Sequence, residues 1–169
     1  MAYYVRRFSY WRDLPFCLGL FRNPETRELM FDGWQAWRRF CFSGKFAGRY
    51  LCIRRLEQKE ERVGMVNFSF GKPNEYWMSG ALKDRYLNSG IGVYACIAFI
   101  DSFYREHPGA VIWAGTFLNN TRCYKMLSKI GFRTTTADDT HRECYLTEDF
   151  FDNDFVAQLK QRYYINQYF

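Results

Sequence analysis

The sequence has no long apolar run, no cysteines at metal-binding spacing and only two histidines. Apolar stretches stay short of the roughly 18 residues that span a membrane, and residues 1–13 lack the continuous apolar core of a signal peptide. These absences predict a cytoplasmic protein that is not inserted in a membrane. Because the six cysteines form no C-x-x-C pair, we expect free buried thiols, no metal site and no disulfide framework.

Internal repeats, low-complexity segments and linkers are also missing, which at 169 residues indicates a single domain over residues 1–169. The hydrophobic fraction of 48% and the aromatic fraction of 21% exclude a disordered chain. At this length about two-thirds of the surface of the unfolded chain can be buried. The formal net charge of +6 suggests an anionic partner, which can be a nucleic acid, a membrane surface or a phosphorylated cofactor.

Hydrophobic periodicity predicts strands and helices in a mixed order. The predicted strands are residues 3–8, 50–56, 63–70, 75–82, 111–117, 133–136 and 142–146. The predicted helices are residues 13–22, 34–42, 93–106 and 121–130, followed by a C-terminal helix that starts at residue 147 and an aromatic tail that ends at residue 169. Asp13 and Pro15 are interpreted as the N-cap and the first turn of the first helix. The apolar run 111–117 is typical of a central strand buried on both faces.

Residues 87–92, Leu-Asn-Ser-Gly-Ile-Gly, lead into the long apolar helix. A glycine-rich turn that opens a helix presents unpaired backbone N–H groups and the positive end of the helix dipole, which together bind phosphate. Residues 90–95 also satisfy the G-x-G-x-x-A pattern of dinucleotide-binding folds, which place it after the first strand with an acidic residue about 20 positions later. Here several strands precede the loop and residues 111–117 contain no acid, so the nicotinamide interpretation fails.

This loop and a second motif resemble those of the GNAT superfamily of acyl-CoA-dependent N-acetyltransferases. The family's loop has the form Q/R-x-x-G-x-G/A, which residues 87–92 match except at Leu87. Its later motif is an asparagine three residues before a small residue, then a helix ending in Gly-Phe; Asn120, Cys123 and Gly131-Phe132 match it. The start of the chain is similar to the branch of ribosomal-protein N-terminal acetyltransferases and their amino-sugar-modifying relatives. The residues in common with that branch are Asp13, Leu14, Arg22, Asn23, Glu25 and Met30.

The resemblance implies an α/β (α+β) fold with a mixed, mostly antiparallel sheet of about seven strands, splayed between the fourth and the fifth and flanked by helices. It implies acetyl-CoA as co-substrate and no metal, with the pyrophosphate on the N–H groups of residues 88–93 and the pantetheine arm in the splay. The residues implied in coenzyme A binding are Leu82, Lys83, Asn88, Ser89, Gly90, Ile91, Gly92, Val93, Asn120 and Cys123. Whether the acyl group is acetyl or longer stays open.

In this family a neutral amine attacks the thioester directly in a ternary complex. Proximity supplies much of the rate, so a strong base is not compulsory, but an alkyl ammonium with a pKa of about 10 must first lose a proton. Glu75 and Asp84 are the acids nearest the predicted cleft and are candidate bases. Many relatives protonate the thiolate with a tyrosine where this chain has Leu127. Tyr124 and the thiol of Cys123 are candidate replacements, and the family's usual acid on strand 111–117 is also missing.

Neither the fold nor the donor site determines the acceptor. In this family the N-terminal helices form the acceptor wall, and here they carry aromatic residues able to stack on a sugar or a base. These residues are Tyr10, Trp11, Phe31, Trp34 and Trp37. Our prediction is a small-molecule amine such as an amino sugar nucleotide. The alternatives are a protein N-terminus as acceptor, or a non-catalytic coenzyme A-binding module of the same fold.

A nucleic-acid partner is disfavoured by how the positive charge is distributed. The arginine pairs at 6–7, 38–39 and 54–55 are isolated, without the basic aromatic strand motif of RNA-binding sheets. We therefore expect neither a nucleic-acid nor a membrane partner. The aromatic tail, residues 163–169, is too apolar to stay free in water, so it is expected to dock on its own domain or on a second subunit as a possible homodimer.

Overall fold

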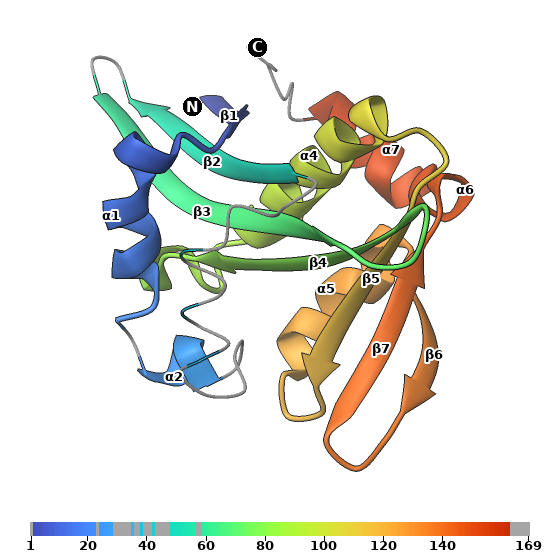
Figure 1. Cartoon of the computed structure of the whole chain (residues 1–169). Coiled ribbons are helices and arrows are strands. Elements are labelled where there is room, and N and C mark those ends of the chain that lie inside the picture. The colour runs from blue at the N-terminus through green and yellow to red at the C-terminus, as the bar shows by residue number, and fades with distance from the viewer. Residues whose placement is uncertain are drawn as a thin grey trace.

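A seven-stranded sheet forms the centre of the molecule (Figure 1). The computed structural model describes residues 2–22, 24–28, 48–56 and 59–162, together with residues 35, 38 and 42. The strands are β1 (Ala2–Arg7), β2 (Gly48–Leu56), β3 (Lys59–Phe70), β4 (Glu75–Leu82), β5 (Val111–Phe117), β6 (Arg133–Ala137) and β7 (His141–Leu146). Their order in the sheet is β1-β2-β3-β4-β5-β7-β6, and only β4 and β5 are parallel neighbours. The predicted mixed, mostly antiparallel sheet is confirmed.

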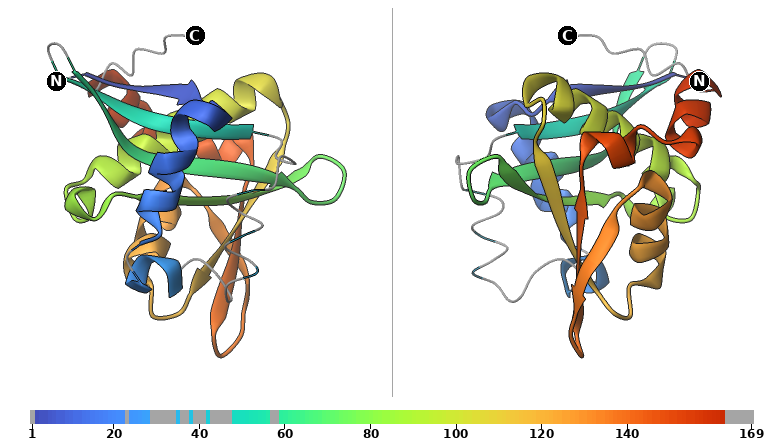
Figure 2. Two further views of the ribbon diagram at one scale, coloured as in Figure 1. Left: turned by 60° about the vertical axis from the view of Figure 1, so that its left-hand side comes forward. Right: turned by 90° about the vertical axis from the view of Figure 1, so that its right-hand side faces the viewer.

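Helices cover the two faces of the sheet unequally. They are α1 (Tyr10–Leu20), α2 (Pro24–Glu28), α4 (Ile91–Glu106), α5 (Thr121–Ile130), α6 (Glu148–Phe151) and α7 (Asp154–Arg162), with a 3-10 turn, η1, at Asp84–Tyr86. Helix α1 lies on one face, and α4 lies on the other (Figure 2). The main core is built around Ile97, Ile100 and Phe103 of α4, which are fully buried. A smaller core packs Cys17 and Leu20 of α1 against β2 and β3.

Strands β4 and β5 pair only where they begin. The paired positions are Glu75 with Val111, Tyr76 with Ile112 and Trp77 with Trp113. Beyond Trp77 the two strands diverge, β4 toward the start of α4 and β5 toward the start of α5 (Figure 1). The predicted splay between the fourth and fifth strands is therefore present, and it opens toward the glycine loop.

The prediction that β5 is buried on both faces is wrong. Ile112, Ala114 and Thr116 are buried against the α4 side, whereas Trp113 is half-buried and Gly115 is exposed on the other face. The sequence did not show this alternation, because Trp113 and Gly115 both count as apolar residues although neither is fully buried. The half-exposed face of β5 is the face on which α1 covers part of the neighbouring strands.

The prediction of a single C-terminal helix is also wrong, because the chain breaks between α6 and α7. Asn153 lies at the break: its Nδ2 donates to the carbonyl oxygens of Ile130 (2.9 Å) and Phe150 (2.8 Å). Its Oδ1 accepts the N–H of Val156 at 3.1 Å, as an N-cap does. The side chain thus ends one helix, starts the next and attaches both to the end of α5. The predicted aromatic tail, residues 163–169, lies outside the described residues.

The sequence prediction that Asp13 is the N-cap of the first helix is wrong. Helix α1 begins earlier, with Ser9 at the N-cap position, and Asp13 lies one turn inside with its side chain fully buried. Arg6 donates two hydrogen bonds to its carboxylate, at 2.6 and 2.7 Å, and Arg62 donates a third at 2.9 Å. The carboxylate therefore ties α1 to β1 and β3.

The other sequence predictions concern the helix expected at residues 34–42, the cysteines, membrane insertion and metal binding. The helix predicted at 34–42, with Trp34 and Trp37, falls mostly outside the described residues. The five described cysteines are free thiols, and four of them are buried. Within the described ranges no helix has the length and apolar character needed to cross a bilayer. No cluster of three or more histidine, cysteine or acidic side chains suited to a metal is found there either.

Candidate functional site

The loop between β4 and α4 has an irregular backbone held by local contacts. Tyr86 in η1 is buried in the main core and so attaches the loop to that core. Asn88 (φ 62°) and Gly90 (φ 79°) both adopt the left-handed region. At Gly90 a Cβ would meet no atom within 4 Å, so the glycine is required by its backbone angle and not by crowding. The two left-handed residues turn the chain sharply into the first turn of α4.

This turn leaves backbone N–H groups available for an anion. The N–H groups of Ser89 and Val93 donate to carbonyl oxygens inside the loop, at 3.4 and 3.3 Å, and that of Ile91 donates to the Ser89 hydroxyl at 3.4 Å. None of the hydrogen bonds found among the described residues uses the N–H of Asn88, Gly90 or Gly92. Three donors at the positive end of a 16-residue helix match the requirements of a phosphate.

Gly92 has a different role from Gly90. A Cβ at position 92 would lie 3.1 Å from Cδ1 of Leu82, the last residue of β4. The absence of a side chain lets the first turn of α4 pack directly on the end of that strand. Leu82 thus acts through packing, since it sets the distance between the strand and the loop.

Arg122 is a contact that sequence reasoning missed. Its guanidinium, in the first turn of α5, donates to Oδ1 of Asn88 at 2.9 Å. The pair connects the start of α5 to the loop and places a positive charge beside it. The signal was weak in the sequence, because one exposed arginine 34 positions from its partner looks like ordinary surface.

Lys83 and Arg85 do not direct their charge into the loop. Both lie against Glu61 of β3, with Nζ of Lys83 at 3.8 Å from its carboxylate. The ammonium of Lys83 also lies 5.3 Å from the ring centre of Phe16 in α1. The structure therefore turns these two cations toward α1 and β3, whereas Arg122 takes the position beside the loop.

Asn120 and Cys123 meet at the start of α5, beyond the end of β5. The Oδ1 of Asn120 accepts the N–H of Cys123 at 3.2 Å and so caps the helix. Burial raises the pKa of the Cys123 thiol, outweighing the effect of a hydrogen bond with Thr116. A thiol with a raised pKa is a poor acid, and this weakens Cys123 as a replacement for the missing tyrosine.

Tyr124 lies away from the splay. Its hydroxyl accepts from Oγ1 of Thr134 at 3.4 Å, and the guanidinium carbon of Arg142 lies 4.4 Å from its ring centre. Hydrogen bonds with Thr134 and Ser128 lower the pKa of the phenol. Thr134 and Arg142 belong to β6 and β7, which lie on the other side of β5 from β4. The structure therefore does not bring this hydroxyl to the opening.

Glu75 and Asp84 lie at opposite ends of β4. The strand from Glu75 to Leu82 rises about 23 Å, at about 3.3 Å per residue, so the two carboxylates cannot serve one reacting centre. Tyr76 packs its ring on Phe103 of α4, with centroids 5.0 Å apart, and its neighbour Glu75 faces the opposite side of the sheet. Glu75 is half-buried close to the point where the strands part, whereas Asp84 is exposed beside the loop.

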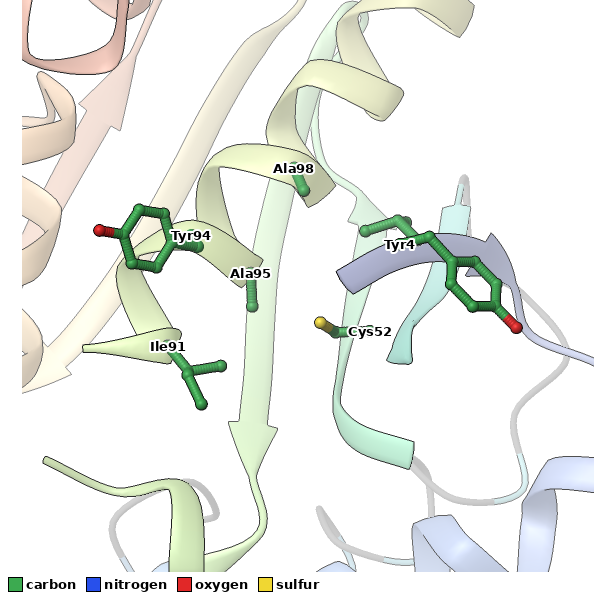
Figure 3. Close-up of a pocket in the computed structure, with 7 residues that line it drawn as sticks. Tyr4, Cys52, Ile91, Tyr94, Ala95 and Ala98 are labelled. Atoms are coloured by element: carbon green, nitrogen blue, oxygen red, sulfur yellow. The ribbon is translucent and has the colours of Figure 1, made fainter. Parts of the chain in front are cut away.

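A small apolar hollow lies between α4 and the first strands (Figure 3). Ile91 and Ala95 of α4 face Cys52 of β2 across it, while the ring of Tyr4 points away from α4. Burial raises the pKa of the Cys52 thiol to about 12, so it is not a nucleophile at neutral pH. This hollow offers neither charge nor a reactive group, so it is not a candidate catalytic site.

Comparison with known proteins identifies the fold. No family model and no curated protein sequence matches the chain. Among solved structures, a GNAT-family acetyltransferase from Bacillus anthracis matches with a TM-score of 0.70 and 18% identity, over 88% of this chain and 96% of that chain. The aminoglycoside acetyltransferase AAC(6')-Ib in complex with coenzyme A matches with a TM-score of 0.67 and 15% identity, over 89% and 98%. The ribosomal-protein-S5-alanine acetyltransferase of Vibrio fischeri matches with a TM-score of 0.67 and 17% identity, over 90% and 97%. The chain has the fold of these acetyltransferases.

Proposed function

We propose that this chain is an acetyl-CoA-dependent N-acetyltransferase that moves an acetyl group to a primary amine. The observation that carries the proposal is the loop of residues 88–92, which lies at the open end of the β4–β5 splay. Three of its N–H groups have no partner among the described residues. The fold is shared with an acetyltransferase crystallised with coenzyme A. In this proposal residues 1–169 form one acyltransferase domain.

The loop fits the pyrophosphate of coenzyme A, and the unpaired strand edges fit its pantetheine arm. The residues assigned to this site are Leu82, Lys83, Asn88, Ser89, Gly90, Ile91, Gly92, Val93, Asn120 and Cys123. Lys83 belongs to it through its backbone, because its ammonium lies beside Glu61. Among them the N–H groups of Asn88, Gly90 and Gly92 bind phosphate, and Leu82 and Gly92 set the width of the cradle. Backbone groups of β4 beyond Trp77 lack a β5 partner and are positioned to pair with an extended ligand.

The chemistry needs a neutral amine beside the thioester. Bound acetyl-CoA would supply the thioester, so that a C–N bond forms at its carbonyl carbon and the C–S bond breaks. The proton that the nitrogen loses on becoming an amide is taken up by the thiolate. Glu75 is the better placed of the two candidate bases, since it lies close to where the strands part and faces away from α4. It accepts the proton of the ammonium directly or through a water. Asp84, at the phosphate end, is the less suitable candidate.

Glu75→Gln is expected to lower kcat by about 100-fold, the lower end of the range for losing a general base. Tyr124→Phe is expected to leave kcat within about twofold, because its hydroxyl contacts Thr134 and not the opening. Release of the coenzyme A thiol, followed at saturating acetyl-CoA, measures both. The opposite pattern, a large loss in Tyr124→Phe and none in Glu75→Gln, would reverse these assignments.

Arg122→Ala is expected to weaken acetyl-CoA binding by about tenfold, the effect of losing one charge-assisted contact of about 1.5 kcal/mol. The physical reason is that Asn88 loses the partner that holds its side chain beside the loop. Lys125→Ala, which removes an exposed cation from the same helix, is the matched control and should leave binding unchanged. Titration calorimetry measures the affinity of both variants for acetyl-CoA. Equal losses of affinity would mean that the positive charge of the helix, and not the contact with Asn88, contributes to binding.

For the acceptor we propose a small-molecule amine such as an amino sugar nucleotide. A protein N-terminus is the alternative, because relatives in fold act on an aminoglycoside and on a ribosomal protein. A non-catalytic coenzyme A-binding module is favoured by one observation, the absence of a tyrosine at 127 and of an acid on β5. The test is titration of acetyl-CoA followed by a screen of amines for thiol release. Binding without turnover of any amine would favour the module, and no binding would refute both.

A further inference from the structure

Three buried N–H donors have no hydrogen-bond partner among the described residues, and two of them flank β4: Nδ2 of Asn67 and Nε1 of Trp113. The third, Nε of Arg6, belongs to the Asp13 cluster. Asn67 is fully buried in the second half of β3, and its Oδ1 accepts from Nε of Arg49 at 2.8 Å. That contact defines the orientation of the amide, because a flipped amide would place a donor against the guanidinium. A buried donor left without an acceptor costs about 1–3 kcal/mol, so two of them near one site require an explanation.

The two donors lie on the same face of the sheet, on either side of β4. Asn67 is opposite Ser79 of β4 and is two residues from Met65, which packs in the α1-side core. Trp113 pairs with Trp77 of β4 on that same face. β3 and β5 are separated by β4, so the two backbones lie about 10 Å apart, at about 4.8 Å per strand spacing. The donors therefore contact separate groups of any ligand that reaches both.

Between and beside these donors the face presents a row of aromatic rings. The rings of Trp77 and Trp113 are stacked with centroids 5.8 Å apart, and the ring of Tyr145 follows at 5.7 Å on β7. All three are half-buried, and Gly115, the next residue of β5 on this face, is exposed with open space where a Cβ would be. The row lies where β4 and β5 part, which is where the proposed function places the thioester.

We propose that this face binds an acceptor amine built on hydroxylated rings, with the apolar ring faces on the Trp77–Trp113–Tyr145 row and ring oxygens accepting from Asn67 and Trp113. The inference rests on the proposed function and adds the residues that select a hydroxylated ring as the acceptor. Hydroxyl and ring oxygens supply the acceptor atoms that both buried donors lack. This row of rings contacts the apolar faces of a sugar ring through buried area and dispersion.

The same chemistry disfavours a simple polyamine. A protonated polyamine carries only N–H donors along an apolar chain, so it leaves both buried donors unpaired. A site built to hydrogen-bond an oxygen rejects an analogue that lacks it by a large factor, because its buried polar groups stay unsatisfied. The expected order of kcat/KM is therefore a two-ring amino sugar first, with spermidine and cyclohexylmethylamine far behind.

The test compares neamine, a two-ring amino sugar, with cyclohexylmethylamine, spermidine and an alanine tripeptide as acceptors for the full chain. Asn67→Asp replaces the N–H donor by a carboxylate oxygen, which adds a negative charge and keeps an acceptor for Arg49, and Trp113→Phe removes the N–H and keeps a ring. Each is expected to raise the KM for neamine about tenfold while kcat changes less than about twofold. Trp77→Phe, in the same row, removes the same ring area without removing a buried unpaired donor, so its smaller rise in KM measures the part of the Trp113→Phe effect that ring area alone accounts for.

If Asn67 and Trp113 only stabilised the fold, their variants would change the melting temperature and not the KM for one class of acceptor. The melting temperature of Asn67→Asp should stay close to that of the wild type, because the new carboxylate keeps the contact with Arg49 and pairs its charge with the guanidinium. Equal KM changes for neamine and spermidine, or a preference for spermidine or the tripeptide in the wild type, would overturn the inference and leave the acetyltransferase proposal intact. Failure to turn over any amine despite acetyl-CoA binding would refute the proposed function instead.

Discussion

Gly90→Glu should weaken the binding of acetyl-CoA by about 1000-fold, which is about 4 kcal/mol at 1.4 kcal/mol per tenfold change. Two effects add at this position. A non-glycine residue at φ 79° carries backbone strain of about 1–3 kcal/mol, and relieving it moves the N–H groups of the loop. The carboxylate also places negative charge where the pyrophosphate is proposed to bind, at the positive end of α4. Titration calorimetry with acetyl-CoA measures the loss directly.

Gly109→Glu is the matched control for this prediction. Gly109 follows the other end of α4, has φ 72°, and has no atom within 4 Å of the position of a Cβ. The same substitution there imposes a similar strain and the same charge far from the loop. Both variants should lose similar thermal stability, while only Gly90→Glu loses binding. Parallel losses of affinity in the two variants would show that strain in α4, and not the loop, controls binding.

Much of the sheet and of the loop could be predicted because their signals are local. The strand Glu75–Leu82 and the helix Thr121–Ile130, with its Gly131-Phe132 ending, appear as the sequence indicates. The left-handed angle at Gly90 is a property of a few consecutive residues, and so a glycine-rich turn before an apolar helix reveals it. These elements depend on short-range patterns that a single sequence contains.

The features that sequence reasoning missed depend on pairs distant in the chain. Asn67 looks like a polar residue in an apolar strand until its contact with Arg49 and its place opposite Ser79 of β4 are known. The break before α7 depends on a hydrogen bond from Asn153 to Ile130, 23 residues earlier. The direction of Tyr124 depends on Thr134 in an edge strand. Spacing along the chain does not contain such relationships, because the fold alone brings these side chains together.

Asp13→Asn should lower the free energy of unfolding by about 3–5 kcal/mol at neutral pH, the cost of leaving a buried ion-pair partner without its counterion. The carboxylate is fully buried, while the side chains of Arg6 and Arg62 are 16% and 33% exposed. An asparagine at this position cannot accept from both guanidinium groups with a full charge. The guanidinium groups then remain in a partly desolvated environment without compensation. Urea unfolding at pH 7 measures the difference between variant and wild type.

The difference in the free energy of unfolding between the wild type and Asp13→Asn should also depend on pH. Burial alone would raise the pKa of Asp13, but hydrogen bonds from Arg6, from the N–H of Ser9 and from Arg62 lower it from 3.8 to about 2. Because the folded pKa lies below the unfolded value, the carboxylate contributes fully above about pH 4, and about 2 kcal/mol is lost as the pH falls through about 2. The gap between wild type and Asp13→Asn should therefore narrow over that window.

Asp101→Asn is the control that compares the loss of a buried carboxylate with the loss of an exposed one. Asp101 forms ion pairs with Arg105 and Lys160, whose side chains are 55% and 39% exposed. Such exposed pairs contribute about 0–1 kcal/mol, so this variant should unfold close to the wild type. If Asp13→Asn were no more destabilised than Asp101→Asn, the carboxylate would not be what holds α1 on β1 and β3. The rigid placement of α1 beside the proposed acceptor face would then have to come from the apolar contacts of Cys17 and Leu20.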